Sequence, residues 1–516
     1  MSEQILLQGK ILGIEEFLLS STGAPALAGL REEELLSGRA QWISLLSEVL
    51  PRALLAEFGL ARILLGSSGG GQFLLVLPGE FRGPAQESLA AAARDIALLS
   101  DGHLRLIWAV TENLGDWITV RKRLNEELTR RRGAPLAGHA AEAFRAFDPA
   151  PPALHADYFC MELGRKVREA HQIAWSPESP ARIVAGEGKH AWRLTPNLSA
   201  DGIVMARHAA PDDAGHRMAS LEVLARRSDG RPGWGVLRGD VDHFGVRLRR
   251  LSTIEEHVSL SVLSKQFFAG EIEVLCSMPD FWRKVTVLYT GGNDFAVYGA
   301  WDALIPLARE IQRLFHRFAE ENLKDFPGPE GKTITMGLAL GDSAGATLAS
   351  VYEEAGRNLA LAKAADKDCI YVLGRVLEWK RLGDASELKD IFLRMEGGER
   401  LHPQALLDLR GIYSKVSAAG PLETAPAVDR VWRFHRRLRT ILGAGRDKEF
   451  QKLRNHLAGE IAGRKTTQVK LRPSGLVAIE WARLLLEAGP RTDLFPAPEP
   501  EAVAAMAPAA GVEHEA

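Results

Sequence analysis

Apolar positions in the second half of the chain follow a regular order of strand and helix patterns. Short runs rich in β-branched and aromatic residues are typical of strands, and apolar residues three or four apart are typical of helices. Two strands flank Gly291 and Gly292, which is typical of a β-hairpin with a tight turn at its tip. The predicted order is strand 234–238, helix 251–268, strand 285–289, strand 295–298, helix 304–318, strand 333–340, helix 346–364 and strand 369–373.

An earlier stretch repeats this order with few identical residues, which indicates an internal duplication. When the two first strands are aligned, Lys10 takes the place of Asp240 and Leu12 that of Asp242. If both copies fold alike, only the second can hold a metal ion through carboxylates. The first copy comprises strand 5–7, helix 42–58, segment 62–65, a glycine turn at 69–71, strand 73–77, helix 87–99, strand 104–110 and helix 118–131.

Carboxylates stand where the strands of the second copy end. Enzymes that join or cyclise nucleoside triphosphates hold a divalent metal between carboxylates on adjacent strands. Asp240 ends one strand and Asp294 lies at the neighbouring hairpin tip, so both are candidate catalytic residues. We predict that Asp240, Asp242 and Asp294 bind Mg²⁺ or Mn²⁺ if the site is active. Asp240 and Asp242 have a second explanation, because an aspartate after a strand also caps a following helix.

Phosphate-binding residues are predicted beside these carboxylates. Gly291, Gly292 and Asn293 form a turn that lets a phosphate approach the backbone closely. Lys363 and Lys367, one helical turn apart, are placed to meet a triphosphate. A Gly-Gly-Asn-Asp sequence is also an ordinary hairpin turn, and two such lysines can form a solvated face. The order of all these features favours two palm domains of the nucleotidyl-cyclase type.

The remaining segments differ in composition from the two copies. Residues 149–232 are rich in Pro, Gly, Asp and Ser, and the end of the chain is rich in Pro, Ala and Glu. We therefore predict an α+β fold with two ferredoxin-like palms. The predicted segments are a degenerate first palm at 1–145, an insert at 146–231, a second palm at 232–384, a helical domain at 385–490 and a disordered tail at 491–516.

One stretch is strongly basic, with thirteen Lys or Arg against four acids between residues 429 and 472. Such a stretch can grip a nucleic-acid backbone through release of counterions, or it can be a solvated helix face. Candidate contacts to RNA or to a neighbouring subunit are Arg433, Arg436, Arg437 and Arg439.

The net charge and cysteine content of the whole chain say more about its cellular compartment than about its binding partner. The formal net charge of −2 over 516 residues indicates neither an acidic nor a basic partner. Cys160, Cys276 and Cys369 are far apart, which excludes a disulfide framework and a CxxC zinc pair. No signal peptide or membrane-spanning run is recognisable. These features favour a reducing cytoplasm.

Four motifs together carry a family resemblance. They are SSGGGQF at 67–73, GVLRGDVDHFG at 235–245, YTGGNDF at 289–295 and LAKAADKDCIY at 361–371. On these motifs the chain resembles, over nearly its whole length, the large subunit of type III CRISPR effector complexes, the Csm and Cmr class. The hairpin element alone also resembles diguanylate cyclases.

The resemblance implies two facing palms that bind ATP and polymerise it into cyclic oligoadenylates when the complex holds target RNA. It also implies guide RNA and other Cas subunits as partners, with the helical domain contacting small subunits. Asp240, Asn293 and Asp294 fall on metal positions, and Lys363 and Lys367 fall on phosphate positions. Residues of the facing nucleotide site would be Ser67, Ser68, Gly69 and Gly70.

Three departures from the family matter. The chain starts directly at the first palm and its first histidine is His103, so we expect no HD nuclease domain. Only Cys160 stands in the insert, where relatives carry zinc-binding cysteine pairs, so we expect no zinc. Asn293 stands where the family has aspartate, and a neutral amide binds a hard cation more weakly. Synthesis is therefore expected to be weakened or lost.

Two other functions remain open. The second palm could be an active nucleotidyl cyclase that makes cyclic oligoadenylate. A free-standing signalling cyclase that makes a cyclic dinucleotide is also conceivable, but such an enzyme needs neither the first palm nor a basic helical domain. The leading hypothesis is a scaffold subunit of an RNA-guided, RNA-targeting antiviral complex, with an impaired ATP-binding palm pair.

Overall fold

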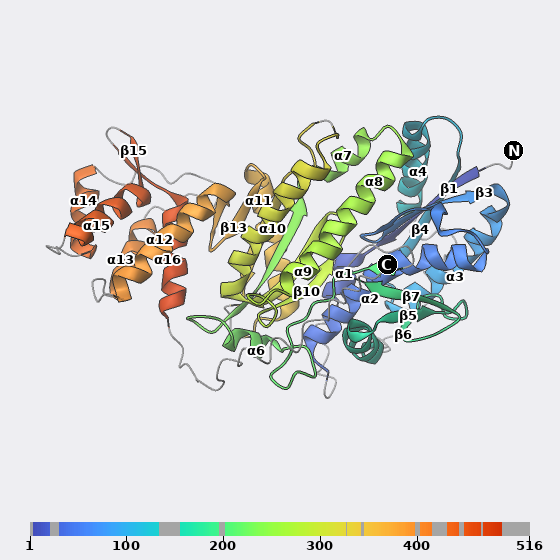
Figure 1. Cartoon of the computed structure of the whole chain (residues 1–516), viewed down its shortest axis with the longest axis horizontal. Coiled ribbons are helices and arrows are strands. Elements are labelled where there is room, and N and C mark those ends of the chain that lie inside the picture. The colour runs from blue at the N-terminus through green and yellow to red at the C-terminus, as the bar shows by residue number, and fades with distance from the viewer. Residues whose placement is uncertain are drawn as a thin grey trace, which may run out of the picture.

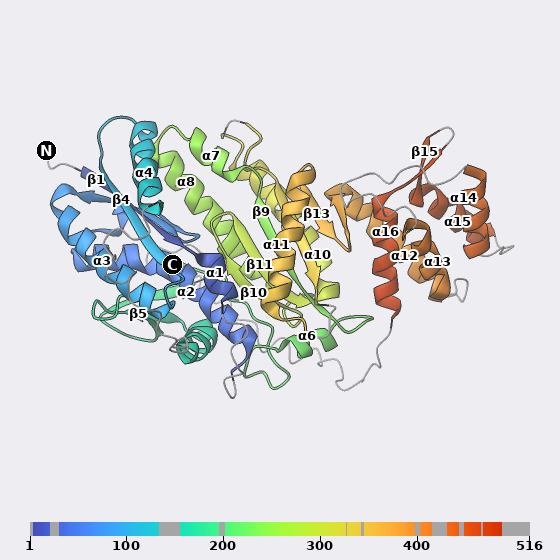
Figure 2. The same ribbon diagram turned by 180° about the vertical axis from the view of Figure 1, so that it is seen from behind.

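The protein is an elongated assembly of α/β units, followed by helices at one end (Figure 1). The structure is a computed structural model of the whole chain. It describes residues 4–20, 30–133, 155–195, 202–326, 328–341, 345–397, 403–414, 431–442, 448–465 and 468–487. The first palm lies at one end, the second palm occupies the middle, and the C-terminal helices lie at the far end (Figure 2).

The first palm is a four-stranded sheet in the order β2-β3-β1-β4. Its side chains alternate between the two faces, as the pleat of a strand requires. Ile5 and Leu7 pack against α2 and α3, whereas Leu6 packs against α4 on the opposite face. The elements are β1 (Gln4–Leu12), α1 (Ile14–Leu19), α2 (Glu32–Glu57), η1 (Arg62–Leu64), β2 (Leu65–Gly69), β3 (Gln72–Pro78), η2 (Gly79–Phe81), α3 (Arg82–Leu99), β4 (Arg105–Glu112) and α4 (Trp117–Arg132).

The second palm is a six-stranded sheet in the order β10-β11-β9-β12-β13-β14. Leu237 and Phe295 face η4, α9 and α10, whereas Val236 and Tyr298 face α11 and the long helix α2 of the first palm. The elements are β9 (Trp234–Val241), α7 (Phe244–Arg250), α8 (Ile254–Lys265), η4 (Gln266–Glu271), α9 (Ile272–Cys276), β10 (Val285–Thr290), β11 (Asp294–Ala300), α10 (Trp301–Asn322), β12 (Ile334–Leu340), α11 (Leu348–Ala365), β13 (Cys369–Val372) and β14 (Arg375–Glu378). The two palms therefore share one apolar core.

The insert has a small sheet of its own, in the order β6-β5-β7-β8. Its apolar residues nevertheless belong to the core of the palms, because Phe159 packs against Trp42 of α2. The elements are the π-helix η3 (Tyr158–Val167), β5 (Gln172–Trp175), β6 (Ile183–Ala185), β7 (His190–Thr195), β8 (Gly202–Val204) and α6 (Leu221–Arg226). Burial raises the pKa of the Cys160 thiol to about 12, which disfavours the thiolate that zinc binds.

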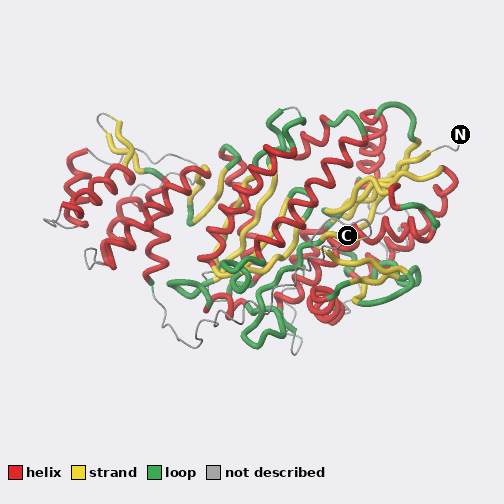
Figure 3. The backbone as a smooth tube through the Cα atoms, in the orientation of Figure 1, coloured by secondary structure: helices red, strands yellow, loops and turns green. Residues whose placement is uncertain are grey.

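Where the structure describes it, the C-terminal part is helical apart from one hairpin (Figure 3). Phe392 and Trp481 belong to the same apolar cluster as the second palm. The elements are α12 (Trp379–Gly397), α13 (Pro403–Ser414), α14 (Val431–Leu442), α15 (Lys448–Ile461), β15 (Ala462–Lys465), β16 (Gln468–Leu471) and α16 (Pro473–Leu486). The predicted tail at 491–516 lies outside the described residues. Of the described helices, none is both long and apolar enough to span a membrane.

One predicted helix of the second palm is wrong in its extent. Instead of a single helix at 251–268, α7 ends before Leu251, α8 starts after Thr253, and the helix then passes into a π-helical turn. Thr253 and Glu256 form a capping box, in which each side chain accepts a hydrogen bond from the other residue's backbone N–H. The T-x-x-E spacing is visible in the sequence, so this boundary was predictable.

Candidate functional site

The glycine turns of the two palms meet tip to tip. Gly69, Gly70 and Gly71 all have positive φ, and a Cβ atom on Gly70 would lie 3.1 Å from the backbone nitrogen of Gly292. A side chain at Gly70 would be strained by its φ and would press on the facing backbone. The tertiary structure thus brings together two turns that lie more than two hundred residues apart.

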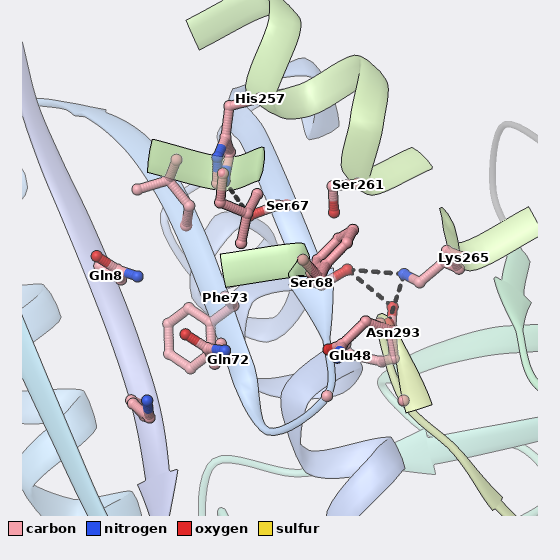
Figure 4. A pocket seen from close by; sticks show the side chains of 18 of the residues that line it. Gln8, Glu48, Ser67, Ser68, Gln72, Phe73, His257, Ser261, Lys265 and Asn293 are labelled. Atoms are coloured by element: carbon pink, nitrogen blue, oxygen red, sulfur yellow. Dashed lines mark hydrogen bonds and ion pairs between the residues drawn. The ribbon is translucent and has the colours of Figure 1, made fainter. Parts of the chain in front are cut away.

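A cavity of about 660 Å³ lies between the palms at this junction (Figure 4). Its walls include Lys10 of the first palm and Phe244 of the second. Among the predicted site residues, the cavity is lined by Ser67, Ser68, Gly69, Gly70, Gly291, Gly292, Asn293 and Asp294. Asp240, Asp242, Lys363 and Lys367 are not part of its lining.

A buried ion network joins the palms along one wall of the cavity (Figure 4). Lys265 of α8 lies 2.5 Å from a carboxylate oxygen of Glu48 on α2, and Arg52 lies 2.6 Å from the other oxygen. Ser68 donates to Glu48 over 2.9 Å and accepts from Lys265 over 2.9 Å. Burial alone would raise the pKa of Glu48, but the two cations hold it at about 2. Of this network only Ser68 was predicted from the sequence, because Glu48, Arg52 and Lys265 lie in no recognised motif.

His257 lies on the same wall. Its ring is 5.3 Å from the ring of Trp117, and its Nε2 is 3.4 Å from the hydroxyl of Ser67. Burial, with Arg121 nearby, lowers the pKa of His257 to about 4. The imidazole is therefore neutral at neutral pH and adds a polar, uncharged edge to the cavity.

Asp240 is held by two side-chain donors beside the tip of the second hairpin. It pairs across the strands with Asp294, and its Oδ1 accepts a 2.6 Å hydrogen bond from Nδ2 of Asn293. The ammonium of Lys363 forms an ion pair with the other oxygen, Oδ2. The backbone carbonyl of Asn293 also accepts from the N–H of Val241, so the hairpin tip is fixed against β9.

The other two aspartates point to different partners. Asp242 is buried and accepts from the hydroxyls of Thr333 and Thr335, over 2.8 and 2.7 Å, and from the N–H of Asp368 over 3.0 Å. Asp294 accepts from the hydroxyl of Tyr289 over 3.2 Å, and burial raises its pKa above the ordinary value. Each carboxylate therefore has protein donors of its own.

The donor set does not fit a divalent ion in this arrangement. Among the residues that the structure describes, no three His, Cys, Asp or Glu side chains are grouped so that they could hold a metal ion. A metal at Asp240 would have to displace Lys363 and break the bond from Asn293. Metal binding by Asp240, Asp242 and Asp294 stays a prediction, and their contacts speak against it.

Lys367 does not lie one helical turn after Lys363 on a shared helix. Helix α11 ends at Ala365, and Lys367 follows in the left-handed region with φ 59. Its ammonium lies 3.0 Å from Nε2 of His243. Lys367 and Asp368, both with positive φ, turn the chain into β13, and the ion pair with Asp240 is made by Lys363.

The predicted nucleic-acid contacts lie on a helix. Arg433, Arg436, Arg437 and Arg439 all belong to α14, and the last three of them are exposed. Their contact with RNA or with another subunit stays a prediction.

The second palm matches the model of a known domain family. Residues 234–371 match the model of the Cas10/Cmr2 second palm domain. A Cas10/Csm1 protein of Thermococcus onnurineus, described as a single-strand-specific deoxyribonuclease of the subtype III-A CRISPR system, is 26% identical over 31% of this chain and 21% of its own length. The Mycobacterium tuberculosis protein of the same description is 29% identical over 21% of this chain and 16% of its own length. The matches thus span about a fifth or less of these relatives.

Solved structures resemble a larger part of the chain. A Csm1–Csm4 cassette in complex with cA3 superposes with a TM-score of 0.65 at 17% identity, covering 94% of this chain and 70% of that chain. A Csm1–Csm4 cassette in complex with one ATP gives a TM-score of 0.64 at 16% identity, with 94% and 70% covered. At such low sequence identity, the structural similarity shows that this chain shares the fold of these proteins and nothing further. The expected α+β arrangement with palm domains is confirmed, and so is the resemblance to type III large subunits.

Proposed function

We propose that this chain, whose second palm belongs to the Cas10/Cmr2 family, is the large scaffold subunit of a type III CRISPR complex and binds ATP between its palms. One observation carries the ATP site: the glycine tips of both palms meet beside a polar cavity of about 660 Å³. A cavity of this size suits a ligand as large as a nucleotide. Exposed backbone at the two tips suits phosphates.

Synthesis of cyclic oligoadenylate by this site is weakened or lost. The step in question is attack of a ribose hydroxyl on an α-phosphate, which in this class of reaction depends on bound divalent metal. Asn293 removes one carboxylate, and Lys363 covers another at Asp240. The remaining residues bind and orient the nucleotide more readily than they activate it.

Proposed partners are a Csm4-like subunit, other Cas subunits, guide RNA and target RNA. Support comes from the solved relatives, in which Csm1 is paired with Csm4. The exposed arginines of α14 add a positively charged surface at the far end of the chain. Guide RNA is a fitting polyanion for such a surface.

Nucleotide binding is tested with Gly70→Ala. The added methyl group would press on the second hairpin, so affinity for AMP-PNP, measured by calorimetry, should fall by about tenfold or more. Gly59→Ala is the matched control, because Gly59 has a similar φ of 64 but nothing within 4 Å of its Cβ position. If Gly70→Ala binds AMP-PNP with unchanged affinity, the nucleotide site does not lie at the glycine tips.

Catalysis is tested by incubating the chain with ATP or GTP and Mg²⁺ or Mn²⁺, alone and assembled with guide and target RNA. We expect little or no cyclic oligoadenylate from either sample by mass spectrometry. Abundant oligoadenylate from the assembled sample would show that the cyclase is active. A cyclic dinucleotide made by the chain alone would refute the CRISPR assignment.

A further inference from the structure

Asp240 is neutralised by groups of this chain. Its Oδ1 takes the amide hydrogen of Asn293 over 2.6 Å, and its Oδ2 takes the ammonium of Lys363. The Asp240 and Lys363 side chains are 23% and 29% exposed, so solvent screens the pair only partly. A divalent ion at Asp240 must therefore compete with an ammonium that is already in place.

Asn293 attracts Asp240, whereas an aspartate at the same position would repel it. An aspartate at position 293 would place a second carboxylate where the amide now donates. Two carboxylates in contact repel unless a metal ion or a proton lies between them. An amide in that place attracts Asp240 directly. Asparagine at position 293 therefore removes one carboxylate ligand of a metal ion. It also removes the charge repulsion that a metal ion would have to neutralise.

Nearby aspartates do not provide an alternative metal site. Both oxygens of Asp242 accept hydrogen bonds from Thr333, Thr335 and the backbone of Asp368. The carboxyl of Asp294 accepts from Tyr289. The positive charge for a bound phosphate must then come from side chains that line the cavity, which include Lys10 and Lys265.

We propose that the second palm binds its nucleotide without a divalent metal at Asp240, because Asn293 and Lys363 already occupy and neutralise that carboxylate. Asn293 lines the cavity and also contacts Asp240, whereas Lys363 is not part of the cavity lining. This inference rests on the nucleotide site proposed above.

The test compares AMP-PNP binding by the full-length chain in excess EDTA and in excess Mg²⁺, measured by calorimetry. We expect the two affinities to agree within about threefold, because no metal bridges the nucleotide to a carboxylate. Asn293→Asp should bind at least about tenfold more tightly in Mg²⁺ than in EDTA, because it recreates a metal-dependent pair.

Binding of Mn²⁺ without nucleotide gives a second measurement. Electron paramagnetic resonance distinguishes free from bound Mn²⁺, and we expect bound Mn²⁺ with Asn293→Asp but not with the natural chain. Tight binding of Mn²⁺ by the natural chain, abolished by Asp240→Asn, would overturn the inference.

Lysine variants test the role of Lys363. Lys363→Met should allow Mn²⁺ to bind at Asp240, and Lys363→Arg should still exclude it, because the competing charge is retained. Lys380→Met is the matched control, because Lys380 is a lysine on α12 and has no ion pair with Asp240. If Lys363→Met binds no more Mn²⁺ than the control, the inference is wrong.

The calorimetric outcomes separate the two proposals. Binding by the natural chain that requires Mg²⁺ would overturn the metal-free inference and leave the nucleotide site intact. Absence of binding in both buffers would overturn the nucleotide site itself, and this inference with it.

Discussion

Replacing Glu48 by glutamine tests whether the buried ion network holds the two palms together. The Glu48 side chain is only 5% exposed and lies between Lys265 of the second palm and Arg52 of its own helix. Glutamine keeps the shape of the side chain but removes its charge. Lys265 and Arg52 would then remain buried beside a neutral group.

The magnitude follows from the pKa of Glu48, which lies at about 2 against an ordinary value of 4.5. A shift of this size means that the folded chain favours the charged form by roughly 3 kcal/mol, and Glu48→Gln should lose about that much stability at neutral pH. Because the pKa is lower in the folded chain, this contribution is complete above about pH 5 and is lost as the pH falls toward 2. The difference between the natural chain and the variant should therefore shrink by roughly 2 kcal/mol by about pH 3.

Urea unfolding followed by tryptophan fluorescence, at neutral and acidic pH, measures this difference. Glu34→Gln is a matched control, because Glu34 is also buried, its pKa is held at about 2 by Arg165, Arg31 and Arg217, and it does not line the cavity. Both variants should be destabilised, but only Glu48→Gln should weaken AMP-PNP binding. A stability loss for Glu48→Gln that does not change with pH would refute the electrostatic argument.

Two further predictions concern other parts of the chain. Thr335→Val removes a buried 2.7 Å hydrogen bond to Asp242 and should lower the free energy of unfolding by about 2 kcal/mol, whereas Thr129→Val on the exposed face of α4 should change it by less than about 0.5 kcal/mol. Equal effects would contradict a special role of the Asp242 hydrogen bonds. Replacing Arg436, Arg437 and Arg439 together by glutamine should weaken binding of single-stranded RNA and reduce the slope of log affinity against log salt by about 0.7 for each phosphate that is no longer neutralised. Unchanged affinity and slope in filter-binding assays would mean that these arginines form a solvated face.

The order of strands and helices in both palms was predictable because it depends on local pattern. Short apolar runs located β9 and β11, and the glycine pair marked the hairpin between β10 and β11. The position of Asp240 opposite Asp294 follows from the same hairpin and from the strand that pairs with it. The short strand β14 was missed because four residues at the edge of a sheet carry too little periodicity to stand out.

The sequence by itself determined the elements, the duplication and the residue types at the hairpin. Which side chains touch was decided only by the tertiary structure. Glu48 and Lys265 meet because α2 packs against the second palm, and no periodicity links residues on separate domains. Likewise, Lys363 was expected to face phosphates, yet packing of α11 beside β9 brings it to Asp240. Long-range contacts depend on how the elements pack, and here that packing decides whether Asp240 meets an ammonium or remains open to a metal.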